Sequence, residues 1–187
     1  STYSPDKQFT LNLLSAVGVG PTPAFATQQT FATGSAPVGS TTADVNGDGL
    51  PDLIVTNAGS NTVSVFLNTT APGATSPSFA AQQTFAAGAE PFAVAVADVN
   101  GDGEPDLIVT NYTDNTVSVL LNQVTPGATM LTSGSFAAQQ TFATGTQPFG
   151  VTAADVNGDG LPDLIIANLG SDTVSVLLNT TAPGATT

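Results

Sequence analysis

The sequence contains no histidine, no cysteine and no tryptophan, and its only basic residue is Lys7. Without histidine or cysteine, the chain cannot form a Ser-His-Asp or Cys-His nucleophilic site, and it lacks the usual zinc ligands. Disulfide bonds are excluded for the same reason. Lysine and arginine total 1 against 14 aspartates and glutamates, so the formal net charge is -13. The chain therefore lacks the basic surface that nucleic acids require, and an anionic membrane surface would repel it.

Apolar residues are spread along the chain rather than gathered in one long run. They make up 41% of the 187 residues, which is sufficient for a packed core in a single domain. No run approaches the roughly 20 residues of a membrane-spanning helix, so we expect no membrane insertion. The 19 glycines and 13 prolines favour short strands joined by turns. Because the chain begins at Ser1 without a recognisable leader, we expect a processed or excerpted protein.

Three copies of one sequence unit organise the chain. The segment Ala-Asp-Val-Asn-Gly-Asp-Gly begins at Ala43, Ala97 and Ala154, and each copy is followed by Pro-Asp-Leu-Ile and then by Thr-Val-Ser-Val. The copies are separated by 54 and then 57 residues, and the three extra residues lie around Met130. Length variation confined to one place predicts a surface loop there.

Each repeat contains four segments with the pattern of a β-strand. In the second repeat, residues 92–97 alternate large and small apolar side chains, and residues 107–110 are continuously apolar, as in a strand buried on both faces. The first repeat adds an alternating third strand at 62–67, and a polar outer strand is predicted at 79–85. Four antiparallel strands per repeat are typical of β-propeller blades. A calcium-binding β-roll repeats about every nine residues, and a Greek-key sandwich has no reason to repeat its sequence.

The number of predicted strands does not complete a propeller. Residues 2–14 resemble a third strand and residues 24–31 an outer strand, whereas the last repeat ends after its third strand. We therefore expect one repeat region over 1–187, with repeats at about 25–78, 79–135 and 136–187 and a partial blade at 1–24. Propellers usually have four to eight blades. The sequence predicts either an excerpt of a longer propeller or a homo-oligomer, in which the leading outer strand of one copy completes the last blade of another.

A loop rich in oxygen-bearing side chains lies between the first and second strands of every repeat. Each loop reads Asp-Val-Asn-Gly-Asp-Gly-X-Pro-Asp, with oxygens at positions 1, 3, 5 and 9 and glycine at position 6. A tightly wound loop directs positions 1, 3 and 5 toward one point, and position 7 adds a backbone carbonyl. Such oxygens suit Ca²⁺, so we expect about three Ca²⁺ ions per chain. The predicted ligands are Asp44, Asn46, Asp48, Leu50, Asp52, Asp98, Asn100, Asp102, Glu104, Asp106, Asp155, Asn157, Asp159, Leu161 and Asp163.

Other interpretations of the loop explain less of its pattern. An EF-hand loop requires glutamate at position 12, where Val55, Val109 and Ile166 stand, and it is flanked by helices rather than strands. A simple Asn-Gly-Asp-Gly turn explains the asparagine and glycines, but not the aspartates at positions 1 and 9 in all three copies. Mg²⁺ fits less well than Ca²⁺ because it prefers a rigid octahedron with retained waters.

The distribution of charge also points to a bound cation. The three loops hold nine of the chain's aspartates, and no lysine or arginine lies near them in the sequence. Neighbouring carboxylates repel by about 1 kcal/mol or more per pair, and three Ca²⁺ ions would change the formal charge from -13 to -7. Extracellular calcium modules bind with a Kd of roughly 10⁻⁴ to 10⁻³ M, which is too weak for resting cytosol. We therefore expect a secreted protein that is extracellular or at the cell surface.

The loop, the apolar strand after it and a Gly-x-x-Pro element before it together resemble the FG-GAP repeats of integrin α-subunit propellers. The Gly-x-x-Pro elements are residues 34–37, 88–91 and 145–148, and the Phe-Gly element occurs only at Phe149-Gly150. The form is most similar to the bacterial VCBS-type repeat. The resemblance implies a β-propeller, usually of seven blades, with structural calcium. Relatives occur in adhesins, lectins and secreted enzymes, where the propeller is often an accessory module.

These observations together favour a calcium-binding interaction or adhesion module without catalytic activity, whose partner is a protein or a glycan. The turns between second and third strands, such as the one at Tyr112, differ between repeats and are candidate recognition loops. The alternatives are a carbohydrate-binding, lectin-like propeller and a non-catalytic accessory domain of a secreted enzyme. A lectin usually stacks an aromatic residue on a sugar, whereas we expect the repeated Phe25, Phe79 and Phe136 to pack in the core.

Two further patterns have weaker functional interpretations. A glycosidase needs a pair of carboxylates, and Glu90 and Asp114 are the acids outside the loops that could form one. We expect them instead to be solvated turn residues. Asn68, Asn111 and Asn179 each begin a glycosylation sequon, which recurs partly because the repeat itself recurs.

Overall fold

The structure, a computed structural model, describes residues 24–182. Within that range the chain forms β-strands and no helix, which confirms the expected all-β class. The chain divides into two units, residues 1–30 and 31–187, and every strand found in residues 24–182 belongs to the second. The strands are β1 (Pro37–Ala43), β2 (Asp52–Asn57), β3 (Thr62–Phe66), β4 (Gln83–Ala86), β5 (Pro91–Ala97), β6 (Asp106–Asn111), β7 (Thr116–Leu120), β8 (Gln140–Ala143), β9 (Pro148–Ala154), β10 (Asp163–Asn168) and β11 (Thr173–Leu177).

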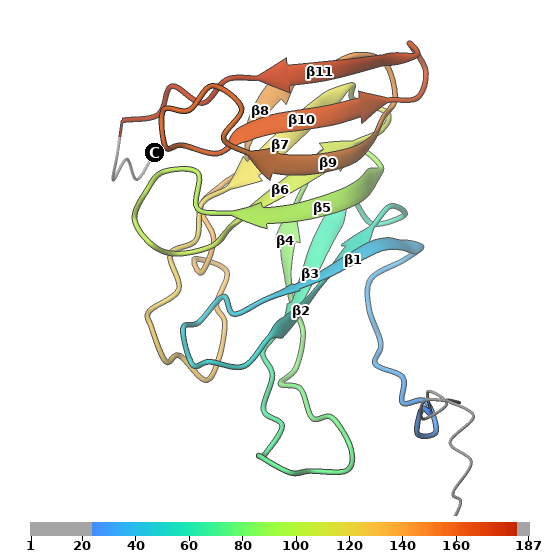
Figure 1. The fold of residues 1–187 in the computed structure, drawn as a ribbon. Helices are drawn as coiled ribbons and strands as arrows, with labels where there is room; N and C mark the ends of the chain where they lie inside the picture. The colour runs from blue at the N-terminus through green and yellow to red at the C-terminus, as the bar shows by residue number, and fades with distance from the viewer. Residues whose placement is uncertain (1–23, 183–187) are drawn as a thin grey trace, which may run out of the picture. The chain divides into compact units, whose positions relative to one another are not determined.

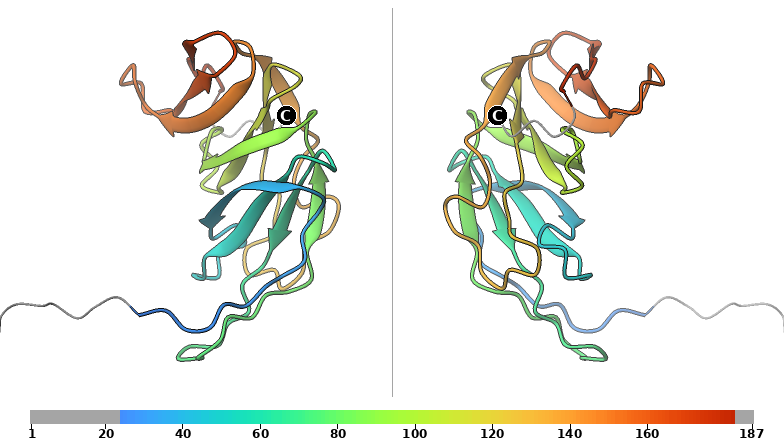
Figure 2. Two further views of the ribbon diagram at one scale, coloured as in Figure 1. Left: turned by 90° about the vertical axis from the view of Figure 1, so that its right-hand side faces the viewer. Right: turned by 90° about the vertical axis from the view of Figure 1, so that its left-hand side faces the viewer.

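The strands form three antiparallel sheets that are stacked side by side (Figure 1). The first sheet has the order β1-β2-β3-β4, the second β5-β6-β7-β8 and the third β9-β10-β11. The leading strands of successive sheets contact one another, β1 with β5 and β5 with β9, and the sheets fan out from them (Figure 2). These are the blades of a β-propeller. The described residues form part of a propeller and not a closed ring.

Each sheet uses the same pairing between its strands. Leu53 lies opposite Phe66 in the first sheet, and Leu107 lies opposite Leu120 in the second. The turn at residues 57–61 joins β2 to β3 as predicted, with Asn61 in the left-handed region at a φ of 55°. The repeated sequence therefore produces a repeated backbone, and equivalent residues can be compared directly between sheets.

Two predicted strands differ from the structure. The outer strand predicted at 79–85 is shorter, because β4 begins at Gln83 and Phe79 forms only an isolated bridge with Asn68. The outer strand predicted at 24–31 is wrong, since these residues contain no strand. A strand requires a neighbour with which to exchange hydrogen bonds, and no described strand pairs with this segment. The third strand predicted at 2–14 and nearly all of the partial blade at 1–24 lie outside the described residues.

The hydrophobic core consists of two clusters, one at each interface between sheets. The first joins Val63 and Val65 of β3 to Leu107 and Val109 of β6, and the second sheet packs on the third in the same way. Burial of apolar area contributes about 25 cal/mol per Å², so the stacking of one sheet on the next is the main stabilising contact. Stability in this fold therefore depends on neighbouring sheets covering each other.

The loop with three extra residues lies on the surface, as predicted, and Met130 at its tip is 74% exposed. Leu131 next to it packs against the first core cluster. No helix among the described residues has the length and apolarity to cross a bilayer.

Candidate metal centre

The candidate metal centre consists of three loops that join the first two strands of each sheet. We refer to them as loop 1 (residues 44–52), loop 2 (residues 98–106) and loop 3 (residues 155–163). Position 6 of loop 1 is Gly49, whose φ of 88° is strained for any residue with a side chain. Its counterparts have φ values of 92° and 90°. The predicted need for glycine at position 6 is thereby confirmed, and the three loops share one conformation.

The aspartate at position 1 lies inside the winding of its own loop. In loop 1, Oδ1 of Asp44 accepts a hydrogen bond from the N–H of Asp48 at 3.1 Å, and Oδ2 accepts one from the N–H of Gly49 at 2.7 Å. Asp155 in loop 3 accepts the equivalent bonds, and those from Gly160 and Gly158 lower the pKa of its carboxyl below the ordinary value. Backbone N–H groups therefore favour the ionised form of Asp155.

Positions 3 and 5 face the same winding. Oδ1 of Asn46 accepts from the N–H of Asp48 at 3.2 Å, and Nδ2 of Asn46 donates to Oδ2 of Asp48 at 3.0 Å. Oδ1 of Asp48 accepts from the N–H of Leu50 at 2.8 Å. The side chains of positions 1, 3 and 5 are thus gathered around one short stretch of backbone. Glu104 and Leu161 occupy the place of Leu50 in the other loops.

The aspartate at position 9 is buried and joins separate parts of its sheet. Asp52 is 0% exposed; its Oδ2 accepts from the N–H of Val45 and its Oδ1 from the N–H of Asn68, both at 2.8 Å. Asp106 is bonded in the same way to Val99 and Asn122, at 2.9 and 2.8 Å. This carboxylate therefore ties the start of its loop to the end of the third strand, a structural role that sequence analysis did not find.

Burial is the main influence on the pKa of Asp52 and Asp106, the position 9 aspartates of loops 1 and 2. Burial raises the pKa of Asp106 to about 6. The two backbone N–H bonds lower this pKa, and the negative charges of Asp102 and Asp98 raise it further. The pKa of Asp52 is raised for the same reasons, again chiefly by burial. A buried carboxylate beside two other carboxylates is an unfavourable arrangement that a nearby cation would relieve.

The three loops differ in how well they are covered. Asn46 and Asn100 are 2% and 1% exposed, whereas Asn157 in loop 3 is exposed. Loop 1 is covered by the second sheet's long connection, where Nδ2 of Asn46 donates to the carbonyl oxygen of Ala128 at 2.7 Å. Loop 3 has no following sheet among the described residues, so the corresponding cover is missing there.

The residues suit calcium by their chemistry, although the loops are not arranged as a formed cage. Every side-chain donor is an oxygen, which is the ligand type that Ca²⁺ takes. Among residues 24–182, no three side chains of the types His, Cys, Asp and Glu are close enough together to hold a metal ion. The carboxylate oxygens instead accept backbone N–H bonds, as described above. The fifteen predicted ligands lie in the three loops.

A second set of side chains, the asparagines that follow the third strand, makes contacts that sequence analysis did not find; it noted Asn68 and Asn179 only as sequons and did not single out Asn122. Nδ2 of Asn122 donates to the carbonyl oxygen of Val45 at 2.9 Å, and Nδ2 of Asn179 donates to that of Val99 at 2.8 Å. Each bond links one sheet to the loop of the sheet before it. The only sequence signal is the recurrence of asparagine at this position in every repeat.

The remaining predicted residues have local contacts. Asp114 accepts from the N–H of Ala89 at 2.6 Å, and Glu90 accepts from the hydroxyl of Thr113, so the two acids lie at one end of the second sheet and stabilise its turns. Among the repeated phenylalanines, Phe136 is 3% exposed as predicted. The core position predicted for Phe25 is wrong, because this side chain is 95% exposed.

Comparison with known families identifies the repeat. The family described as FG-GAP-like repeat matches residues 44–109 and 100–166, and the family described as FG-GAP repeat matches residues 148–186. These matches cover most of the chain, and each contains at least one of the loops described above. The chain therefore belongs to the FG-GAP-like repeat family. A comparison with curated protein sequences found no match.

Proposed function

We propose that this protein is a calcium-stabilised interaction module that works outside the cell. The observation that carries the proposal is the loop conformation: in three copies, the oxygens of positions 1, 3 and 5 are gathered around one winding with glycine at position 6. The membership of the FG-GAP-like repeat family supports it, since such repeats build interaction modules. Bound Ca²⁺ would neutralise the carboxylates of the loops and would have a structural rather than a catalytic role.

The residues proposed to hold calcium in loop 1 are Asp44, Asn46 and Asp48, with the carbonyl oxygen of Leu50 and the carboxylate of Asp52. Loops 2 and 3 offer the same set. The carboxylates of each loop have no counter-ion within the described residues, because the chain's only basic residue, Lys7, lies outside them. A cation would therefore reduce repulsion among three carboxylates and favour the ionised form of the buried position 9 aspartate.

Calcium titration by isothermal calorimetry tests this proposal. We expect three Ca²⁺ ions per chain, with Kd values of roughly 10⁻⁴ to 10⁻³ M and weaker binding of Mg²⁺. Asp48→Asn should reduce the number of bound ions to two. The matched control is Asp114→Asn, which removes an acidic group outside the loops and should leave three. No heat of binding in the parent protein, or equal effects of both variants, would contradict calcium binding at the loops.

The surface for a partner is proposed at the end of the sheets that carries the turns between second and third strands. There, Phe92 of β5 packs on Phe149 of β9 with ring centroids 4.6 Å apart and on Tyr112 with centroids 5.3 Å apart. Phe149 is 47% exposed. Exposed aromatic rings contribute large contact areas to protein interfaces, which supports a protein partner.

The same aromatic residues also favour a second candidate function, carbohydrate binding, because sugars stack on aromatic rings. A glycan array with the parent protein and with Phe149→Ala distinguishes the two functions. Binding of a defined glycan that is lost in Phe149→Ala supports a lectin, whereas an array without bound glycans supports a protein partner. In either case we expect the carboxylates Glu90 and Asp114 to take no part in catalysis, and Glu90→Gln provides the check on any hydrolytic activity that is found.

A further inference from the structure

The outward face of the third sheet is apolar and exposed, although the equivalent residues of the other sheets are buried. Val63 in the first sheet and Val117 in the second are both 0% exposed, because the next sheet covers them. Their counterpart Val174 in the third sheet is 62% exposed. We call this surface the third-sheet face; it comprises Val156, Ile165, Val174, Val176 and Leu178.

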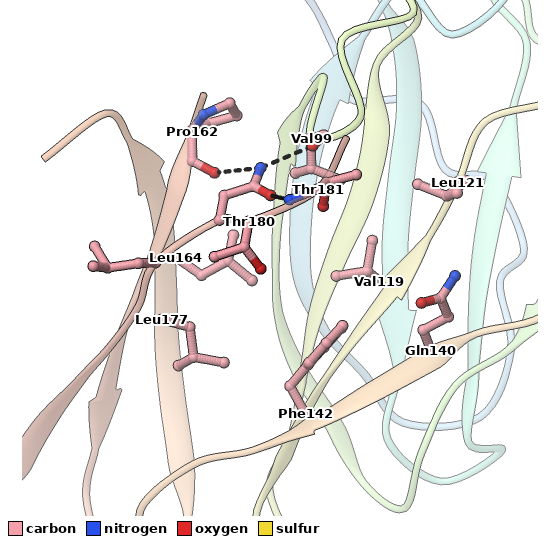
Figure 3. A pocket seen from close by; sticks show the side chains of 12 residues that line it. Val99, Val119, Leu121, Gln140, Phe142, Pro162, Leu164, Leu177, Thr180 and Thr181 are labelled. Carbon is pink, nitrogen blue, oxygen red and sulfur yellow. Dashed lines mark hydrogen bonds between the residues drawn. The ribbon is translucent and has the colours of Figure 1, made fainter. Parts of the chain in front are cut away.

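A pocket of about 420 Å³ lies on the opposite side of the third sheet from this face, between the second and third sheets (Figure 3). Phe142 of β8, Val119 of β7, Leu164 of β10 and Leu177 of β11 surround it. Phe142 is 43% exposed, whereas its counterpart Phe85 in the first sheet is 6% exposed. The pocket is thus an apolar cavity that is open at a position where the other interface is closed.

The equivalent space between the first and second sheets is filled by Phe136. This ring is 3% exposed and packs edge-on against Phe85, with centroids 4.9 Å apart. The side chains around Phe136 in the first core cluster are Val65, Leu67, Leu107 and Leu120. Their counterparts line the pocket one for one: Val119, Leu121, Leu164 and Leu177. The pocket therefore has the lining of a phenylalanine site without the phenylalanine.

The sequence that supplies this phenylalanine occurs three times, beginning at Phe25, Phe79 and Phe136. Each copy reads Phe-Ala-X-Gln-Gln-Thr-Phe-Ala, and the second and third copies end in the outer strands β4 and β8. The first copy, residues 25–32, contains no strand, and Phe25 is 95% exposed. Residues 25–32 therefore have the sequence of an outer strand but pair with no described strand, and the third sheet has no outer strand among the described residues.

We propose that the third-sheet face and the pocket bind residues 25–32 of a second copy of this chain. The register follows from the other sheets, where Val63 and Val65 lie opposite Phe85 and Gln83. It places Phe31 and Gln29 of the second copy opposite Val174 and Val176, and Phe25 of the second copy in the pocket. β11 is an edge strand, and its free backbone groups accept a fourth strand in this register.

The polar contacts between sheets extend across the proposed interface. Asn122 and Asn179 each donate to a loop carbonyl of the preceding sheet, and Nδ2 of Asn179 also donates within its own sheet, to the carbonyl oxygen of Pro162 at 3.1 Å. Nδ2 of Asn68 makes the equivalent bond within its sheet, to the carbonyl oxygen of Pro51 at 2.9 Å. In the proposed assembly Asn68 of the second copy lies beside the carbonyl oxygen of Val156. The second copy's first sheet then covers loop 3, as the second sheet covers loop 1.

In the proposed contact the first described residues of one copy meet the last sheet of the other, which is a head-to-tail arrangement. Such an arrangement forms a closed ring only when the total number of blades is suitable. The described residues of each copy contribute three sheets, and those of two copies contribute six, which is within the usual four to eight blades of a propeller. The net charge of -13 per copy opposes association, so we expect the dimer to be favoured by salt. The proposal rests on the apolar face and not on calcium binding.

Analytical ultracentrifugation of the full chain in 150 mM salt with calcium tests the assembly. We expect twice the monomer mass of 18.5 kDa. Val174→Asp places a charge in the third-sheet face and should raise the dimer dissociation constant at least about tenfold. The matched control, Met130→Asp, changes an apolar side chain of similar exposure outside the face and should leave the mass unchanged. A parent protein that is monomeric, or an assembly larger than a dimer, overturns the proposal.

Engineered cysteines test the register, and the chain has no native cysteine to interfere. Val176→Cys mixed with Gln29→Cys should form a disulfide between copies under mild oxidation, because directly opposite residues have Cα atoms about 5.5 Å apart. The control pair is Val176→Cys with Thr30→Cys, whose side chains point to opposite faces of the strand. Equal yields from the two pairs, or a disulfide within one chain when both cysteines are on it, overturn the proposal. Circular dichroism of every variant verifies folding.

Discussion

The side-chain amide of Asn122 donates a hydrogen bond to the carbonyl oxygen of Val45, 2.9 Å away and 77 residues earlier in the chain. Asn122 is 4% exposed, and its Oδ1 accepts from the N–H of Val124 at 2.8 Å. The bond joins the second sheet to the loop of the first. It is therefore a contact that ties the conformation of loop 1 to the packing of the second sheet on the first.

Replacing Asn122 with alanine should destabilise the fold. The change leaves the carbonyl of Val45 and the N–H of Val124 without their buried partner, which costs about 1–3 kcal/mol for each unsatisfied group. Urea unfolding followed by circular dichroism measures the loss. Gln123→Ala is the control, because Gln123 is the exposed neighbour and its change should stay within about 0.5 kcal/mol. Similar midpoints for both variants would contradict the structural role of the amide.

Replacing Gly88 with alanine should also destabilise the protein. A Cβ atom at this position would lie 2.5 Å from Cγ of Asn111, a buried side chain that is held by Ser118 and Thr116. Overpacking of this kind costs about 1–3 kcal/mol. The same measurement on Gly134→Ala provides the control, since the nearest atom to its Cβ would be 3.9 Å away. Equal stability of Gly88→Ala and the parent would show that the turn can shift.

The stability of the calcium-free protein should decrease as the pH rises from about 4 to about 6. Burial raises the pKa of Asp106 from 3.8 to about 6, so the folded protein binds this proton more tightly than the unfolded chain does. Below about pH 4, protonation of Asp106 stabilises the folded state relative to the unfolded chain. This stabilisation is lost as Asp106 ionises on raising the pH to about 6. The pKa of Asp52 shifts in the same direction.

The measurement is the free energy of urea unfolding at several pH values in the presence of a chelator. Asp106→Asn cannot ionise and should give a shallower slope between pH 4 and pH 6. Asp114→Asn, which lies in a turn outside the loops, should keep the slope of the parent. A slope of the opposite sign in the parent would show that Asp106 is not held protonated.

Removal of calcium should lower the melting temperature. A site at tenfold excess of ligand over Kd stabilises the folded state by about 1.4 kcal/mol, so three sites contribute about 4 kcal/mol. Differential scanning calorimetry with calcium and with a chelator measures the difference. Asp44→Asn should reduce the effect of calcium, whereas Asp172→Asn, outside the loops, should not. A melting temperature that is unaffected by chelator would contradict structural calcium.

The amino-acid sequence by itself determined the repeat, the strands and the loops. Alternating and continuous apolar segments predicted β5 and β6, and the glycine at position 6 predicted the positive φ of Gly49, because these features depend on neighbours in the chain. The resemblance of the loops to FG-GAP repeats was confirmed by the family matches.

Only the tertiary structure showed what equivalent residues do in different sheets. Val63 and Val174 both stand second in the sequence Thr-Val-Ser-Val, yet one is 0% and the other 62% exposed, because burial depends on which sheet lies next. The two roles of Asp52 and the link from Asn122 to Val45 join residues that are far apart in the chain. Such contacts have no local pattern, so they could not be read from the repeat before the sheets were placed against one another.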